Sequence, residues 1–258
     1  MVAAGLSRST AHHAHAVLHR ALADAVRWGL VGRNVAGLVA APRMAEHQMQ
    51  TLSGEQARAF LEAAQGDGFE PLYVLAISTG MRQGELLALH WRDVDLVGGS
   101  LSVTGTLQRG KGTLPIADPK TLRSRRKIAL AAQAVEALRR HRQAQLAWRL
   151  AAGPLWQDLD LVFAAEGGAH VNRDRLIARS FNPLLDKAGI SRIRFHDLRH
   201  TAATLLLAQC VHPKIAQEML GHANIAVTLD RYSHVSQDMQ QDAARLMGEV
   251  LSGPRLPA

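Results

Sequence analysis

Apolar residues recur at helical spacing near the start of the chain. In residues 9–29, the apolar positions 17, 18, 21, 22, 25 and 26 fall on one stripe of a 3.6-residue helix, and Gly29 follows as a stop signal. One long helix cannot bury its own stripe, so this helix needs a partner. Residues 31–50 lose the periodicity and contain several Gly and Pro residues, which indicates a linker before a new unit begins at Thr51.

A second group of helices follows this break. Ser53 and Gln56 have the spacing of a capping box, which predicts a helix that runs through Ala64. Helices are also predicted over residues 70–79, where Gly80 ends the helix, and over residues 83–89. Helical spacing returns over residues 131–151, 173–188, 197–208, 213–220 and 228–232.

Short alternating runs interrupt the helical pattern in the middle of the chain. Residues 93–96, 100–104, 113–116 and 126–130 are separated by Gly-Gly, Gly-Lys-Gly and Asp-Pro turns, which predicts a small antiparallel sheet of hairpins. The expected fold class is therefore mainly α with a small antiparallel β-sheet (α+β), preceded by a partial helical module.

Charge is distributed unevenly along the 258 residues. The chain has 30 Lys and Arg residues against 22 Asp and Glu residues, a net charge of +8. Residues 109–149 hold eleven of these basic residues and only two acidic ones, so this segment carries +9 and the rest of the chain is nearly neutral. A local basic excess is typical of a protein that binds a polyanion such as DNA. The alternative is a solvated basic face that keeps the protein soluble.

Composition excludes several classes of protein. Aromatic residues make up only 4% of the chain, which argues against an aromatic-rich β-sandwich, and a single cysteine, Cys210, cannot form an internal disulfide. No run approaches the roughly 20 apolar residues of a membrane span, and the first ten residues lack the order of a signal peptide. We expect a cytoplasmic, nucleoid-associated protein with no membrane partner.

Four local patterns could carry chemistry: TGMRQGELLAL (79–89), PKTLRSRRKIAL (119–130), HDLRHTAAT (196–204) and LGHANIAVTLDRYSHV (220–235). His196 and Arg199 are three residues apart, so a helix projects both from one face, although snorkelling at the rim of the core is the alternative. Arg82 would sit at a helix N-terminus, where a cation is disfavoured unless an anion is bound there. Gly221 followed by His222 has the form of a helix C-cap.

These residue types fit attack on a phosphodiester by Tyr232. Guanidinium forks suit the equatorial oxygens of a phosphorane, and Arg82 and Arg199 meet that need. A tyrosine hydroxyl with a pKa of about 10 needs a proton acceptor, for which His196 is the candidate. The leaving oxygen needs a proton, which Lys120 could donate from a hairpin. Lys111, Arg123 and Lys127 lie near enough to be alternatives to Lys120, because hairpin registers slip easily.

The four patterns, in this order, resemble the catalytic domain of the tyrosine recombinases, the phage integrase family of site-specific DNA recombinases. The resemblance covers residues 51–240 and rests on T-G-x-R-x-G-E-L, P-K-T, H-x-L-R-H, L-G-H and a tyrosine ten residues after that histidine. It implies DNA cleavage and rejoining through a covalent 3′-phosphotyrosine, without metal or nucleotide. The implied catalytic set, with Glu85 organising the site beside it, is Arg82, Lys120, His196, Arg199, His222 and Tyr232.

The resemblance also implies partners and a domain division. The partners would be double-stranded DNA carrying specific recombination sites, a tetramer of the chain on that DNA, and accessory DNA-bending or directionality proteins. Residues 1–45 would be part of a helical, SAM-like core-binding module, residues 46–50 a linker and residues 51–258 the catalytic domain. Since the family normally carries a complete core-binding domain, we expect an N-terminally truncated member. The basic residues expected to contact DNA are Arg109, Lys111, Arg123, Arg125, Arg126 and Lys127.

Three alternatives stay open at this point. Because the core-binding module is partial, the chain could be a DNA-binding remnant without cleavage activity. A type IB topoisomerase is a second alternative, since it would share the same chemistry. In the first helix, His12, His15 and His19 fall near one face at spacings compatible with a metal. No carboxylate or cysteine joins these histidines, so we expect them to form the polar side of the helix, with no metal site.

Overall fold

The computed structural model describes residues 5–42, 49–107, 116–117, 125–221, 244–245 and 247–248. Several predictions fall outside these residues: the helix over 228–232, most of the strand over 113–116, and six candidate site residues. Those six are Arg109, Lys111, Lys120, Arg123, His222 and Tyr232. The chain forms two compact units, Met1–Met49 and Gln50–Ala258.

The first unit is built on α1 (Arg8–Arg27), close to the predicted helix over residues 9–29. Ser7 caps its start, because the Ser7 side chain accepts a hydrogen bond from the Thr10 amide at 3.1 Å. The helix stops where Gly29 adopts the left-handed conformation (φ 73°). The Leu30 amide then donates to the Ala25 carbonyl at 2.9 Å, so the predicted glycine stop is confirmed.

Histidines of α1 hold the segment that follows it. A short 3₁₀ helix, η2 (Val35–Leu38), lies against α1, and the Nε2 of His15 lies 3.0 Å from the Ala36 carbonyl oxygen. The Nδ1 of His12 lies 3.0 Å from the Pro42 carbonyl oxygen. A ring nitrogen that bonds a carbonyl must carry the proton, so these two nitrogens act as donors to backbone. In the described part of the chain, no group of His, Cys, Asp or Glu side chains has the arrangement of a metal site.

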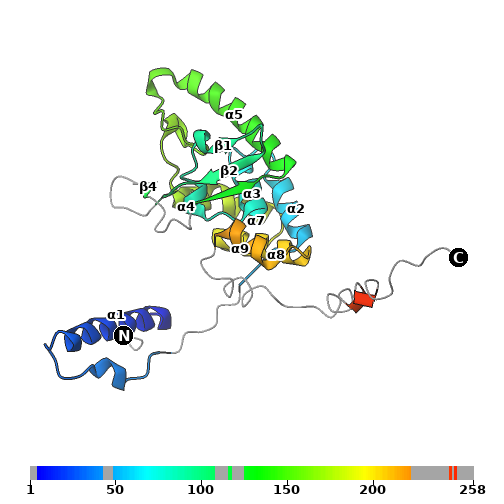
Figure 1. The fold of residues 1–258 in the computed structure, drawn as a ribbon. Helices are drawn as coiled ribbons and strands as arrows, with labels where there is room; N and C mark the ends of the chain where they lie inside the picture. Colours follow the sequence, from blue (N-terminus) through cyan, green and yellow to red (C-terminus); the bar gives the residue numbers. More distant parts are fainter. Residues whose placement is uncertain are drawn as a thin grey trace. The chain divides into compact units, whose positions relative to one another are not determined.

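The second unit is mainly helical, as predicted. Its main helices are α2 (Gly54–Ala63), α3 (Glu70–Thr79), α4 (Gln83–Leu86), α5 (Ala132–Ala152), α8 (Phe195–Ala208) and α9 (Pro213–Leu220). The capping box of α2 is confirmed: the Gln56 amide donates to Ser53 at 3.1 Å, and the Ser53 amide donates to the Gln56 side chain at 3.0 Å. Helix α3 is buried along most of its length, between α5 on one side and α8 on the other (Figure 1).

The sheet is antiparallel and small. Strands β1 (Val94–Asp95), β2 (Ser100–Val103) and β5 (Arg126–Ala129) pair in the order β1-β2-β5. The third predicted run, residues 113–116, does not join this sheet, whereas the fourth, residues 126–130, does as β5. Instead, the end of that third run begins β4 (Ile116–Ala117), which pairs with β3 (Thr106–Leu107) in a separate two-stranded sheet.

Two of the predicted helices differ in the structure: one is shorter and the other is broken into segments. The helix over residues 83–89 ends at Leu86, because the chain beyond it uses its backbone elsewhere: the Leu89 carbonyl accepts from the Val162 amide at 2.8 Å. The helix over residues 173–188 is three segments: α6 (Arg173–Leu176), a π-helical stretch (Ile177–Phe181) and α7 (Asn182–Lys187). Pro183 has no amide hydrogen and crowds the preceding turn, so the helix widens just before it.

An aromatic cluster forms the centre of the core. The ring of Phe60 on α2 lies 5.2 Å from that of Tyr73 on α3 and 5.6 Å from that of Phe181 before α7. All three side chains are completely buried. A hydrogen bond ties the rim of this core to α8, since the Leu52 amide donates to Thr201 at 3.0 Å. Within the described residues, no helix has the length and apolar character needed to cross a membrane.

Replacing Phe60 with alanine tests this packing. We expect Phe60→Ala to lower the free energy of unfolding by about 3–5 kcal/mol, because it leaves a cavity between α2, α3 and α7. Urea denaturation followed by circular dichroism measures the change. The control is Leu150→Ala on α5, where the side chain is 83% exposed and the change should stay within about 0.5 kcal/mol. Equal effects for the two variants would contradict this account of the core.

Candidate active site

The site begins at the turn between α3 and α4. Gly80 ends α3 in the left-handed conformation (φ 63°), as its position after residues 70–79 predicted. A Cβ atom there would overlap the Leu220 side chain of α9 and would lie 3.3 Å from the Ala202 Cβ of α8. Glycine is therefore required twice at this position, by its conformation and by the close approach of two helices. This packing brings the start of α4 against α8 and α9.

Arg82 stands at the N-terminus of α4 and is paired with Glu85 one turn later. The Arg82 amide donates to Glu85 Oε2 at 2.9 Å, and its Nη1 donates to Glu85 Oε1 at 2.8 Å. A third bond runs from Arg82 Nη2 to the Gly221 carbonyl at 3.3 Å. The Arg82 side chain is still 42% exposed. A cation at a helix N-terminus needs a negative partner, and Glu85 provides one for Arg82. The rest of the Arg82 guanidinium faces solvent.

Glu85 is buried and is held by a second arginine as well. Arg126 of β5 donates from Nη2 to Glu85 Oε2 at 2.8 Å and from Nη1 to Glu85 Oε1 at 3.3 Å. Burial raises the pKa of Glu85, but the hydrogen bonds and positive charge of Arg126, followed by those of Arg82, bring the pKa below its ordinary value. Glu85 is therefore charged at neutral pH.

Helix α8 supplies the second predicted arginine. Asp197 fixes the helix start, because its carboxylate accepts from the Arg194 amide and from Arg194 Nη2, both at 2.8 Å. This cap starts the helix at Phe195, two residues earlier than predicted. Arg199 follows on the buried face, and its Nη1 donates to the Gly80 carbonyl at 2.8 Å. Arg199 therefore lies directly behind the turn that carries Arg82.

His196 lies on the more exposed side of the same helix. Its ring meets that of the buried His200 edge to face, with centroids 4.8 Å apart. Although the His196 residue is partly open to solvent, the protein around it and then the positive charge of Arg199 lower the pKa of its imidazole, and Arg82 acts in the same direction. His196 is therefore neutral at pH 7 and is able to accept a proton.

The basic residues expected to contact DNA divide between the two faces of β5. Lys127 is exposed and so is Arg125 just before the strand, whereas the Arg126 side chain is only 8% exposed and points into the site. Arg109, Lys111 and Arg123 lie outside the described residues. Lys120, His222 and Tyr232 also lie outside them, so their predicted roles stay predictions.

One tyrosine of the chain is placed where it cannot act as a nucleophile. The chain has two tyrosines, and Tyr73 is completely buried in the aromatic cluster. Its hydroxyl bonds Ser180 at 2.6 Å, and burial raises its pKa far above the ordinary value of 10. If a tyrosine acts as the nucleophile, it must be Tyr232.

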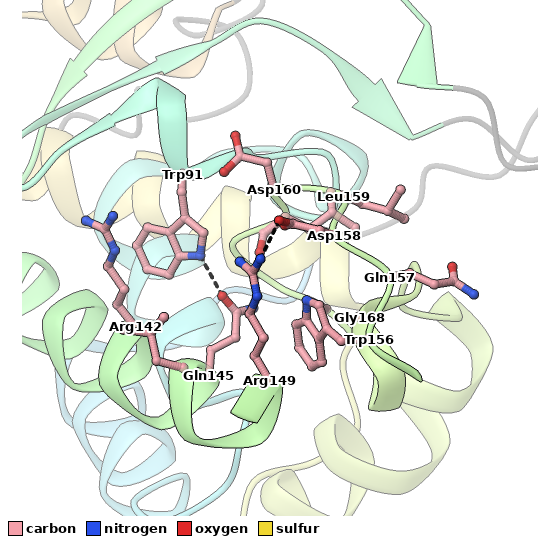
Figure 2. Close-up of a pocket in the computed structure, with 13 residues that line it drawn as sticks. Trp91, Arg142, Gln145, Arg149, Trp156, Gln157, Asp158, Leu159, Asp160 and Gly168 are labelled. Carbon is pink, nitrogen blue, oxygen red and sulfur yellow. Dashed lines mark hydrogen bonds and ion pairs between the residues drawn. The ribbon is translucent and has the colours of Figure 1, made fainter. Parts of the chain in front are cut away.

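A cavity of about 120 Å³ lies elsewhere, between α5 and the loop over residues 156–168 (Figure 2). Its walls include Trp91, which donates to Gln145 at 2.6 Å, and the Arg149 and Asp158 pair at 2.7 Å. The guanidinium of Arg142 lies 5.3 Å from the centre of the Trp91 ring. The cavity contains none of the predicted catalytic residues and shares no residue with the cluster around Glu85.

Three features of the site were not predicted from the sequence. The sequence places Arg126 among the residues expected to contact DNA, yet it alternates in step with Ile128, a core residue, and this period of two is visible in the sequence. Asp197 was not assigned a role, although an acidic residue at the third helical position is a recognised capping signal. The close contact between Gly80 and Leu220 of α9 could not be predicted, because no pattern in the neighbouring sequence indicates it.

Comparison with known proteins now adds to this geometry. The profile of the phage integrase family matches residues 44–239, which is most of the chain. The chain belongs to the phage integrase family. This match spans every predicted catalytic residue, both inside and outside the described part of the structure.

Individual integrase-family relatives agree with the match. A XerC-like tyrosine recombinase of Caldanaerobacter subterraneus is 31% identical over 80% of this chain and 55% of its own length. An integrase of Streptomyces ambofaciens is 32% identical over 96% of this chain and 66% of its own length. The chain thus spans between about half and two thirds of the length of these relatives.

Solved structures of integrases share the fold. The Tn1549 transposon integrase, solved in complex with a circular intermediate DNA, superposes with a TM-score of 0.79 at 22% identity and covers 96% of this chain and 82% of that one. The XerA recombinase superposes with a TM-score of 0.59 at 27% identity, over 84% of this chain and 68% of that one. The predicted fold class and the resemblance to tyrosine recombinases are confirmed.

The electrostatics of this integrase-family site are testable at His196. We expect a pKa below the ordinary value of 6.5, because desolvation and the charge of Arg199 disfavour the protonated ring. Titration of its ring Cε1 proton by NMR measures the pKa, and the urea-unfolded chain supplies the reference. In Arg82→Gln the pKa should rise, since one repelling cation is lost. A folded-state pKa at or above that of the unfolded chain would contradict the described geometry.

Proposed function

We propose that this chain is a site-specific DNA recombinase that cleaves and rejoins DNA through a covalent 3′-phosphotyrosine at Tyr232. The observation that supports this most is the gathering of Arg82, Arg199 and a neutral His196 at the junction of α4 and α8 in a member of the integrase family. This is a site for an anion, since each of the two buried carboxylates, Glu85 and Asp197, is already paired with an arginine and Arg199 adds a further cation.

In the proposed reaction the two arginines bind the scissile phosphate. Each charge-assisted hydrogen bond to a phosphoryl oxygen is worth about 1.5–3 kcal/mol, and guanidinium forks match the equatorial oxygens of the transition state. The part of Arg82 that faces solvent would make these bonds, and Glu85 would keep the side chain in place. His222, one residue beyond the Gly221 carbonyl that Arg82 contacts, would bond the same phosphate.

Tyr232 would attack phosphorus and displace the 5′ oxygen of the next nucleotide. Its phenol proton would pass to His196, which is neutral at pH 7, and Lys120 would protonate the leaving oxygen. The new phosphotyrosine bond replaces the phosphodiester bond, so the reverse reaction with a second 5′ hydroxyl rejoins DNA without nucleotide hydrolysis or a metal ion. In rejoining, the attacking 5′ hydroxyl would return its proton to Lys120, and His196 would return its proton to Tyr232.

The proposed substrate is double-stranded DNA with specific recombination sites. The exposed cations Arg125 and Lys127 adjoin the site on β5, within the basic segment 109–149. Solved relatives include a lambda integrase dimer bound to a core site, and the proposed assembly of this chain is a tetramer on two DNA sites. Accessory DNA-bending or directionality proteins, and action on the nucleoid in the cytoplasm, belong to the same proposal.

Covalent capture from a random pool of DNA tests the function and selects the target sequence in the same experiment. Duplexes with a random central segment and a nick near its middle are incubated with the chain, and DNA that stays attached after denaturation is sequenced. The nick lets the short cleaved strand diffuse away, so the covalent complex accumulates. We expect attached DNA from the wild-type chain and none from Tyr232→Phe. The recovered duplexes should converge on one sequence.

Arg82→Lys provides a graded check in the same assay, since it keeps the charge and removes the fork. We expect cleavage to slow by about 10²–10³, the usual effect of losing a transition-state donor. Arg179→Lys, at an exposed position, is the control and should cleave normally. Binding without attached DNA would instead support the DNA-binding remnant. Attached DNA without sequence preference, together with relaxation of a supercoiled plasmid, would support a type IB topoisomerase.

The role of Lys120 is tested with a modified substrate. A duplex with sulfur in place of the bridging 5′ oxygen needs no proton on its leaving group, because a thiolate leaves readily at neutral pH. We expect Lys120→Ala to cleave the ordinary duplex at least 10²-fold more slowly than the wild type, within the usual range for loss of a general acid. On the sulfur-containing duplex the two should cleave at similar rates. If the sulfur-containing duplex instead restores cleavage by Lys111→Ala or Lys127→Ala, that lysine is the general acid.

A further inference from the structure

The side chain of Arg126 lies inside the protein, whereas its neighbours Arg125 and Lys127 are exposed. In the register of the sheet, Val103 pairs with Arg126 and Leu101 pairs with Ile128, so Arg126 shares the face of β5 that Ile128 turns to the core. Lys127 lies on the opposite, exposed face. An inward arginine on a strand requires partners, and Arg126 has them on two other elements.

The first partner of Arg126 is Glu85. Its two terminal nitrogens reach both carboxylate oxygens, at 2.8 and 3.3 Å, in the fork geometry that is strongest for an arginine and a carboxylate. Arg82 bonds the same carboxylate through one side-chain nitrogen and its backbone amide. Because Arg126 balances the buried charge of Glu85, the second terminal nitrogen of Arg82 is left to bond elsewhere.

The second partner of Arg126 is the end of α9. Its Nε donates to the Met219 carbonyl at 2.8 Å, and its guanidinium lies flat against Gly221. A Cβ on Gly221 would lie 2.8 Å from Arg126 Nη1, and the residue is left-handed (φ 68°), so only glycine fits there. Arg82 meets the Gly221 carbonyl at 3.3 Å. Two arginines thus hold the last residues of α9, and His222 is the next residue in the chain.

We propose that Arg126 is a positioning residue for DNA cleavage: it holds Glu85 and the end of α9 together, and thereby sets both the Arg82 fork and the point from which His222 extends. Without it, Arg82 is the nearest cation to a buried carboxylate and turns further toward Glu85 and away from the phosphate. The effect on cleavage rests on the proposed function, whereas the effect on Glu85 does not.

The charge effect is measured first, in the free protein. We expect ¹³C titration of the Glu85 carboxyl to give a pKa below its ordinary value in the wild type, and a higher pKa in Arg126→Gln, because a cation and two hydrogen bonds are lost. Among the residues that the structure describes, the charged groups that act on the pKa of Glu85 are Arg126 from β5 and Arg82 at the start of α4. An unchanged pKa of Glu85 in a folded Arg126→Gln chain would overturn the inference whether or not the protein cleaves DNA.

Cleavage is measured next, on a duplex recovered by covalent capture. We expect Arg126→Gln to cleave at least tenfold more slowly at saturating DNA, with the affinity for DNA within about twofold of the wild type. The acid limb of its rate profile should move to higher pH, because Glu85 then protonates at higher pH. Arg126→Lys keeps a charge but cannot reach both Glu85 oxygens and Met219, so it should regain only part of the rate.

Two further variants separate a positioning role from simple destabilisation. Arg192→Gln removes an exposed arginine that pairs with Asp186 at 2.9 Å, and its rate should equal that of the wild type. In a Glu85→Gln background, the additional substitution Arg126→Gln should no longer shift the acid limb. If Arg126→Gln lowers the affinity for DNA and leaves the cleavage rate at saturating DNA unchanged, Arg126 is a DNA contact and the proposal is overturned. Failure of the wild type to form attached DNA would reject the proposed function and leave the Glu85 titration to decide on Arg126.

Discussion

The buried carboxylate of Glu85 joins three segments of the second unit. It receives the backbone and side chain of Arg82 at the start of α4, and the fork of Arg126 from β5. A carboxylate without these partners would cost several kcal/mol to bury, so α4 and β5 cannot separate without exposing or protonating it. Arg126 extends the same cluster to α9 through the Met219 carbonyl.

The cluster leaves an excess of positive charge at the site. Glu85 offsets one of its two arginines, and Arg199 adds a further cation behind the turn at Gly80. The field of this charge adds to the desolvation of His196, since the surrounding protein first, and then Arg199 and Arg82, lower the pKa of its ring. A bound phosphate would oppose that field and raise the pKa of His196. The site is therefore arranged so that the arrival of an anion makes the imidazole a better proton acceptor.

Strand β5 divides two tasks between its faces. Because side chains alternate along a strand, Arg126 meets Glu85 inside while Lys127 stays at the surface. The strand follows directly on the segment with Lys120 and pairs with β2, whose buried residues Leu101 and Val103 fix its register. A slip of one residue would exchange the two faces and place Lys127 against Glu85.

Local signals in the sequence were sufficient for much of this protein. The capping box at Ser53 and the glycine stop after α3 depend on residues within one or two turns of each other, and the structure has both. The order of short motifs around Arg82 and Tyr232 was enough to identify the family. The sequence alone thus determined where most helices lie, two of their ends and the kind of chemistry to expect.

Tertiary structure decided which charges are inside. The alternation with Ile128 places Arg126 and Lys127 on opposite faces of β5, but only the pairing of β5 with β2 and the approach of α9 bring Arg126 to Glu85. The early end of α4 likewise depends on a bond to a distant segment, from the Val162 amide to the Leu89 carbonyl. The energy of a buried ion pair depends on groups that meet only after folding, so no local pattern can specify it.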